Sequence, residues 1–223
     1  MAVSLREALA AVPDPRGRRG RRFPLIPCLC LVALGLLAGR LTLKAILELR
    51  ANFGDELPLA LGFPRYRFPS EAALSRLLAR LDPVALEAAL TAWILPRLSA
   101  EQAATLAIDG KALKGSRDGE VPGHHLVEAY APAAEAVLAQ IRVDSKTNEH
   151  KAALDLLGIL PLKGAVVTGD AMFCQRDVAE KVTAAGGDYV LTVKANQPGL
   201  ETDIGAGFAY EAAARSLAAA ISP

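Results

Sequence analysis

The stretch ATLAIDGK (residues 104–111) decides how this chain is interpreted, because its short apolar run ends in a carboxylate beside a glycine. A second stretch, GAVVTGDAM (residues 164–172), has the same arrangement. Runs of this kind predict strands, so Asp109 and Asp170 are expected at the ends of two buried strands. A buried carboxylate must be paired, protonated or bound to a cation, and two on neighbouring strands suit Mg²⁺ or Mn²⁺. Either aspartate alone is equally well explained as a cap of the following turn, but the pair favours a metal site.

The segments around these stretches alternate as in an α/β sheet. We expect strands at 104–109, 124–131 and 136–143, a helix at 148–159, a strand at 164–170, a helix at 175–185 and a strand at 188–194. This order predicts a sheet with an antiparallel start and a parallel continuation. An alanine-rich helix is expected over residues 204–221.

The first hundred residues carry helical signals instead. Ser4 with Glu7 forms a capping-box pattern, Ser70 precedes an amphipathic run, and Asp82-Pro83 is typical of a helix start. A largely helical segment is expected over residues 25–50 with an interruption near Gly39, and a Pro/Gly-punctuated connection over residues 57–69. We therefore predict a helical N-terminal domain at 1–100 and an α/β domain at 101–223.

Charge and cysteine content narrow the class of protein. The formal net charge is +1, yet residues 1–50 hold nine Lys or Arg against three acids, which favours a polyanionic partner for this end. The three cysteines have neither a disulfide framework nor zinc-ligand spacing, which indicates reduced thiols in a cytoplasmic protein. The apolar stretch 23–39 contains two prolines and is too short to span a bilayer, so we expect a core helix and no membrane association.

Three blocks of the α/β domain and two of the N-terminal domain resemble one transposase family. The blocks AIDGK (107–111), VVTGDAMFCQ (166–175) and GDYVLTVKANQ (187–197) are similar to bacterial insertion-sequence transposases of the ISAs group, also called H-repeat-associated proteins, in the DDE superfamily. PDPR (13–16) and FPSE (68–71) resemble that family's helical N-terminal domain. The resemblance implies an RNase H-like fold and transposition of DNA, with insertion-sequence ends and target DNA as partners.

The resemblance also implies a catalytic set. Asp109 and Asp170 would be catalytic metal ligands for two divalent ions, Mg²⁺ or Mn²⁺, that cleave and join DNA strands without a covalent enzyme intermediate. The family's third carboxylate, a Glu on a helix after the last strand, has no match here, and Glu211 is the least unsuitable substitute. We therefore expect a sheet incomplete at the C-terminus and a truncated, catalytically impaired copy. Ala195 stands where many relatives have Asp.

Several basic residues are candidates for DNA contact, and a role in DNA binding or interaction is expected for the N-terminal domain at 1–100. A cationic loop is able to neutralise phosphates, although a solvated loop is the plainer explanation; its arginines are Arg16, Arg18, Arg19, Arg21 and Arg22. Lys111 follows Asp109 directly, and Lys194 ends the last predicted strand. The competing hypothesis is a non-catalytic DNA-binding or subunit-interaction protein, either a homo-oligomer or one that mixes with full-length transposase. An unrelated metal-dependent nuclease would need a carboxylate such as Glu211.

Overall fold

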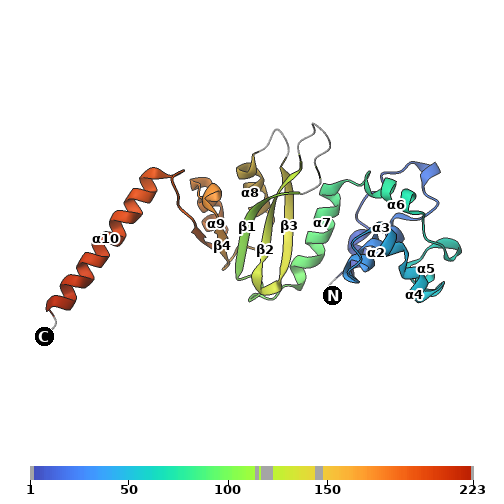
Figure 1. Cartoon of the computed structure of the whole chain (residues 1–223), viewed down its shortest axis with the longest axis horizontal. Coiled ribbons are helices and arrows are strands. Elements are labelled where there is room, and N and C mark those ends of the chain that lie inside the picture. Colours follow the sequence, from blue (N-terminus) through green and yellow to red (C-terminus); the bar gives the residue numbers. More distant parts are fainter. Residues whose placement is uncertain (1–2, 114–115, 117–122, 144–147, 222–223) are drawn as a thin grey trace. The chain divides into compact units, whose positions relative to one another are not determined.

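The computed structural model describes residues 3–113, 116, 123–143 and 148–221, with side chains at all of these except 19, 65 and 211–221. The chain divides into two compact units, Met1–Arg97 and Leu98–Pro223, and each is described by itself (Figure 1). The functional roles predicted for domains 1–100 and 101–223 stay predictions.

The first unit is helical throughout its described part. Its elements are short, and turns containing glycine or proline separate several of them. In chain order they are α1 (Leu5–Leu9), η1 (Arg18–Gly20), α2 (Leu25–Leu37), α3 (Leu43–Leu47), α4 (Leu49–Phe53), α5 (Glu56–Leu61), η2 (Pro64–Tyr66), α6 (Glu71–Leu78), α7 (Pro83–Ile94) and η3 (Leu95–Arg97).

The helix starts follow the predicted capping residues. Ser4 accepts a hydrogen bond from the Glu7 backbone while the Glu7 carboxylate bonds back to Ser4, so the capping box of α1 is confirmed. The Ser70 side chain accepts from the backbone of the third residue of α6, and Asp82 caps α7 with Pro83 as its first residue. These caps satisfy backbone N–H groups that have no partner inside the helix.

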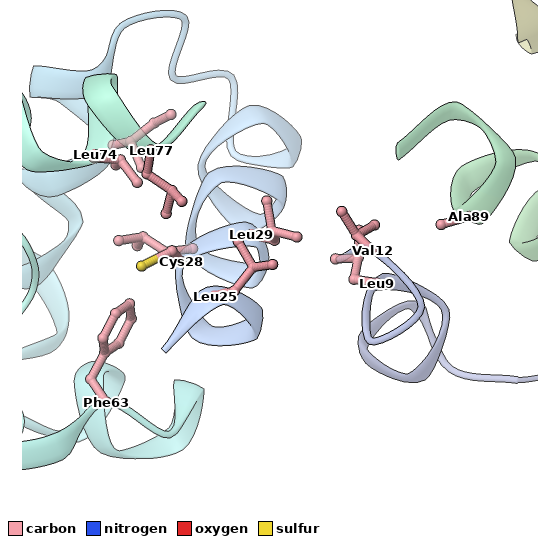
Figure 2. Close-up of a cluster of buried hydrophobic side chains, with 11 residues drawn as sticks. Leu9, Val12, Leu25, Cys28, Leu29, Phe63, Leu74, Leu77 and Ala89 are labelled. Atoms are coloured by element: carbon pink, nitrogen blue, oxygen red, sulfur yellow. The ribbon is translucent and has the colours of Figure 1, made fainter. Parts of the chain in front are cut away.

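The core of the first unit is built around α2. Figure 2 shows Leu25, Cys28 and Leu29 of α2 in the middle, with Leu74 and Leu77 of α6 on one side and Leu9 and Val12 on the other. Helix α3 packs tightly against α2 at Gly35, where an added Cβ would lie 2.5 Å from Cγ1 of the buried Ile46. Only a residue without a side chain fits this crossing.

Two predicted helix boundaries in the first unit have different outcomes. The predicted interruption near Gly39 is confirmed, because α2 ends at Leu37 and Gly39 adopts a positive φ of 71°. The prediction of a plain connection over residues 57–69 was wrong, since α5 occupies Glu56–Leu61. Pro58 is the third residue of α5, where the missing N–H has no helical partner to lose.

The second unit contains a five-stranded mixed sheet in the order β3-β2-β1-β4-β5. β1 pairs antiparallel with β2 and parallel with β4, while β2–β3 is antiparallel and β4–β5 parallel. The predicted fold class, a mixed α/β sheet behind a helical N-terminal region, is confirmed. The strands are β1 (Thr105–Ala112), β2 (His125–Ala131), β3 (Ala136–Val143), β4 (Val166–Gly169) and β5 (Asp188–Leu191), with η4 (Pro132–Ala134) between β2 and β3.

Two helices cover one face of this sheet. α8 (Glu149–Leu157) packs on β2 and β3, and α9 (Arg176–Ala184) packs on β5 and on α8. Their buried side chains include Leu156 of α8 and Val178 of α9, which complete the core with Leu106 of β1. The short turn η5 (Ala171–Phe173) links β4 to α9.

The last elements are exposed. β5 is an edge strand whose Val190 is 65% exposed, and α10 (Pro198–Ile221) begins six residues before the predicted helix at 204–221. Within the part of the chain that the structure describes, no helix is both long and apolar enough to cross a membrane.

Candidate metal and nucleic-acid site

Asp109 lies on the central strand, with its side chain exposed. Leu106 and Ile108, which precede Asp109 on β1, are buried on the face that carries the helices. Strand alternation therefore turns Asp109 to the opposite face. β1 continues to Ala112, so the expectation that Asp109 closes the strand was wrong. The reason is the pairing with β2, which extends to Ala112 opposite His125.

Asp170 directly follows β4, as predicted. Its Oδ1 accepts a hydrogen bond of 3.0 Å from the Met172 backbone, so it also caps η5. Metal binding and capping do not exclude one another, because the cap uses one of the two carboxylate oxygens. The cap fixes the carboxylate orientation without a metal ion.

The register of β1 and β4 brings the two aspartates together. Ile108 and Gly169 are parallel partners, and a Cβ on Gly169 would lie 3.0 Å from Ile108 Cγ1, so this pair shares one face. The next position on each chain is an aspartate, and Asp170 has an extended backbone. Asp109 and Asp170 therefore stand on the same face of neighbouring strands. Both are exposed, which corrects the expectation that they would be buried carboxylates.

Glu128 is a residue of this site that sequence reasoning missed. It lies directly across from Asp109 on β2, and its side chain is only 9% exposed. Its Oε1 forms an ion pair with the Nζ of Lys111. The pKa of Lys111 is raised, first by the hydrogen bond to Glu128 and then by the negative charges of Glu128 and Asp109. The available signal in the sequence was one acidic residue inside the mostly apolar run HLVEAYA. Which residues surround Glu128 depends on the register between β1 and β2, which the sequence pattern does not give.

The opposite face of β1 is filled at this point. A Cβ on Gly110 would lie 3.2 Å from Met172 Cε and 3.3 Å from Glu149 Oε1 of α8. Glu149 in turn lies 3.4 Å from the Nδ1 of His125. This carboxylate therefore belongs to the helix-covered face and not to the face of Asp109.

The donor set fits one divalent ion. Mg²⁺ is commonly bound through one or two carboxylates while it keeps several waters, and Asp109 with Asp170 supplies such a pair. Among the described residues, no group of three or more His, Cys, Asp or Glu side chains is arranged to hold a metal ion. The three-carboxylate set that the resemblance implied is thus not assembled in this part of the chain. Glu201 and Asp203 are exposed on α10, and the side chain of Glu211 lies outside the described residues.

Lys194 lies in the loop between β5 and α10, near the turn that carries Asp170. β5 ends at Leu191 and not at residue 194 as predicted. Two side-chain amides fasten the loop: Asn196 Nδ2 donates to the Ala171 carbonyl at 2.7 Å, and Gln197 Nε2 donates to the Cys174 carbonyl at 3.0 Å. The exposed Lys194 is therefore held near the Asp170 turn.

The basic loop of the first unit contains arginines with different surroundings. Arg16 is nearly buried, pairs with Asp14 at 2.8 Å and donates to the carbonyls of Gly20 and Phe23. This pair raises the pKa of Arg16 and lowers that of Asp14. Arg16 therefore closes the loop on itself, which is a structural task.

The other loop arginines are more accessible. Arg21 is 3.5 Å from Asp14 and donates to the Arg16 carbonyl, yet its side chain is half exposed. Arg18 and Arg22 are exposed, and Arg22 lies over the ring of Phe23 at 5.6 Å. The side chain of Arg19 lies outside the described residues.

A pocket of about 410 Å³ joins this loop to α6. Its lining includes Phe23, Leu74 and Leu77 as apolar residues and Arg16, Arg76 and Arg80 as basic ones. Arg80 donates to the Pro15 carbonyl, while Arg76 is exposed on α6. The loop and α6 thus present basic side chains around one pocket.

Comparisons with known proteins match both units of the chain. The family model described as "Transposase DDE domain" matches residues 101–215, and the DDE_Tnp_1-associated model matches residues 6–94. The "H repeat-associated putative transposase YbfD" of Escherichia coli is 30% identical over 201 residues, which cover 86% of this chain and 77% of that protein. An uncharacterized protein from the dhlA 3' region of Xanthobacter autotrophicus is 35% identical over 200 residues, 86% of this chain.

The relatives are not all matched over their full length. This chain spans 66% of the Xanthobacter protein, 51% of the protein YbfL and 35% of the transposase YhhI, both of Escherichia coli. A cryo-EM structure of a piggyBac transposase synaptic complex with hairpin DNA covers 64% of this chain and 37% of that chain, at 12% identity and a TM-score of 0.33. The similarity to that structure is too low to support any inference. The family models and the YbfD match show that the chain belongs to the DDE transposase family, among the relatives named H repeat-associated, as its sequence blocks predicted.

Proposed function

We propose that this chain binds DNA and that Asp109 and Asp170 hold one divalent ion, Mg²⁺ or Mn²⁺, for phosphodiester cleavage and strand transfer. The observation that supports this best is the register of β1 and β4, which brings both carboxylates to one face of the sheet. Family membership supports the reaction class. Insertion-sequence ends and target DNA are the proposed substrates.

Each residue of the site has a defined task in this proposal. A bound ion would polarise the phosphodiester and acidify a coordinated water. Asp109 and Asp170 would each contribute carboxylate oxygen, and the Met172 backbone already orients Asp170. Lys111 and Lys194 would place ammonium groups beside the DNA phosphates.

We propose further that catalysis by this chain alone is slow or absent. Two carboxylates on the open face of the sheet accommodate one ion, whereas in-line displacement with two ions needs more ligands. Among the described residues no third carboxylate joins Asp109 and Asp170 in a metal-holding group, and Glu128, which lies across from Asp109, is paired with Lys111.

The first unit supplies the proposed DNA surface. Arg18, Arg21, Arg22 and Arg76 are the loop and α6 arginines with exposed side chains, and the pocket between loop and helix is lined by basic and apolar residues. Phosphate neutralisation by such groups is independent of base sequence and weakens as salt rises. Arg16 would act indirectly, by keeping the loop in shape.

Mn²⁺ binding to the full chain, measured by calorimetry, tests the metal site. We expect about one ion per chain, with binding abolished in Asp109→Asn and in Asp170→Asn. Asp203→Asn on α10 is the matched control and should bind like the wild type. Equal binding by wild type and Asp109→Asn would overturn the proposal, as would the absence of binding to wild type.

Nicking of supercoiled plasmid with Mn²⁺ tests the reaction. We expect at most weak nicking by wild type, and none by either site variant. Efficient nicking that survives in Asp109→Asn would assign the chemistry to other residues. Efficient nicking that is lost in Asp109→Asn would show a competent site and refute the proposed impairment.

The basic surface also favours a second candidate function, a DNA-binding protein without catalysis that assembles with itself or with longer transposase chains in the cytoplasm. DNA affinity that needs no metal ion, and that falls in Arg18→Ala and Arg22→Ala while Mn²⁺ binding is absent, would support this candidate. Arg40→Ala is the control, because Arg40 is an exposed arginine of the same unit outside the pocket.

A further inference from the structure

Glu128 is a charged residue in an apolar position of β2. Its residue exposure is 7%, and the neighbours Val127 and Ala129 are fully buried. A carboxylate so little exposed loses much of its hydration, and a paired cation offsets this loss. The paired cation here is the ammonium of Lys111, whose own side chain is 54% exposed.

Lys111 has two carboxylates within its reach. Asp109 is two residues earlier on the same strand, so alternation places both side chains on one face. Glu128 is the direct cross-strand partner of Asp109, and directly opposed residues of an antiparallel pair have Cβ atoms about 4.5–5.5 Å apart. In the structure the ammonium bonds to Glu128 and not to Asp109.

We propose that Glu128 is a positioning residue for Lys111: it keeps the ammonium away from Asp109, so that Asp109 remains open to a metal ion and Lys111 faces the DNA phosphate. The inference rests on the proposed DNA contact of Lys111. Without the Glu128 charge, Asp109 becomes the nearest anion, and Lys111 pairs with it. A single substitution at Glu128 would then block the metal ligand Asp109 and remove the phosphate contact of Lys111.

The proposal predicts that Glu128→Gln changes DNA affinity in the direction opposite to that expected from net charge alone. Removing a negative charge from a DNA-binding face should tighten DNA binding, because repulsion of the phosphates falls. If Glu128 positions Lys111, Glu128→Gln should instead weaken DNA binding, because the ammonium turns to Asp109. A role in folding alone would change the melting temperature without this change in DNA binding.

The test measures binding of the full chain to a fluorescein-labelled DNA duplex by anisotropy, over a series of salt concentrations in EDTA. Lys111→Met should lower the slope of log affinity against log salt by about 1, since each contacted phosphate contributes about 0.9. Glu128→Gln should lower it by the same amount, and the double variant Glu128→Gln/Asp109→Asn should restore it. Asp203→Asn removes an exposed carboxylate of α10 and should leave the slope unchanged. If Glu128→Gln fails to fold by circular dichroism, Glu128→Met fills the same volume without a buried polar group and replaces it.

The outcomes separate this inference from the proposed function. A wild-type slope in Glu128→Gln together with a reduced slope in Lys111→Met would overturn the positioning role and keep the DNA contact. A salt slope that is unchanged in Lys111→Met would overturn both the DNA contact of Lys111 and the positioning role of Glu128. A Glu128→Gln slope that Asp109→Asn does not restore would show that Lys111 does not turn to Asp109, and would also overturn the inference.

Discussion

The crossing of α2 and α3 allows a quantitative prediction about the stability of the first unit. In Gly35→Ala the new Cβ would lie 2.5 and 2.8 Å from Cγ1 and Cγ2 of Ile46, and 3.0 Å from its Cβ. Overpacking of a buried site costs about 1–3 kcal/mol, and contacts this short favour the upper half of that range. Alanine regains about 1 kcal/mol in helix propensity over glycine. We expect a net loss of about 1–2 kcal/mol.

The same geometry predicts that Gly35→Ala no longer destabilises the chain when Ile46 is also replaced by alanine. Ile46→Ala removes both γ carbons, so only the Cβ contact at 3.0 Å remains. The single variant Ile46→Ala should cost about 2–5 kcal/mol because it opens a cavity. In that background Gly35→Ala should be neutral or stabilising by up to about 1 kcal/mol, which corresponds to a coupling of about 1–3 kcal/mol between the two positions.

Urea unfolding followed by tryptophan fluorescence measures this coupling. Trp93 is the single tryptophan of the chain and lies in α7, so its emission reports the first unit. With a urea m-value of about 2 kcal/mol/M, the middle of the usual range, the Gly35→Ala loss should lower the midpoint by about 0.5–1 M. An equal cost of Gly35→Ala in both backgrounds would refute the argument that Ile46 makes this glycine necessary.

Three further predictions concern other parts of the chain. The pKa of Asp14 is lowered by Arg16, so the stability from this pair is present above about pH 4 and lost as the pH falls further; Asp14→Asn should reduce that dependence in acid unfolding followed at Trp93. Burial raises the pKa of Cys28 to about 11, so iodoacetamide at pH 8 should leave Cys28 unmodified in the folded chain and alkylate it in urea, as peptide mass spectrometry would show. Gly187→Ala would place a Cβ 2.6 Å from the Leu162 carbonyl oxygen, and because backbone cannot move aside easily, we expect a loss of at least about 1–3 kcal/mol in a urea titration followed by far-ultraviolet circular dichroism.

Local sequence signals predicted most of the elements. The strand at 136–143 and the capped starts of α1, α6 and α7 were found where the sequence placed them, because alternation and capping depend on near neighbours. The sequence does not reveal α5 because Pro58 and Gly62 are typical turn residues, although proline is tolerated in a first helical turn and glycine ends a helix.

The candidate site was less predictable than the fold. The placement of Asp109 and Asp170 on adjacent strands followed from the pattern, but their exposure did not, since it depends on what covers that face of the sheet. The length of β1 beyond Asp109 and the position of Glu128 depend on the register with β2, which is a tertiary property. Arg16 is nearly buried while the neighbouring arginines whose side chains the structure describes are exposed, because Arg16 forms hydrogen bonds to Asp14 and to the Phe23 carbonyl. A count of charges in the sequence does not predict these bonds.

The amides of Asn196 and Gln197 have a consequence for how this gene can be shortened. They hold the turn around Asp170 from a position more than twenty residues later in the chain. A stop codon or a frameshift at codons 192–195 would keep both aspartates and all five described strands, yet release the turn that orients Asp170. We therefore expect the smallest gene fragment that retains a fully formed two-aspartate site to reach codon 197.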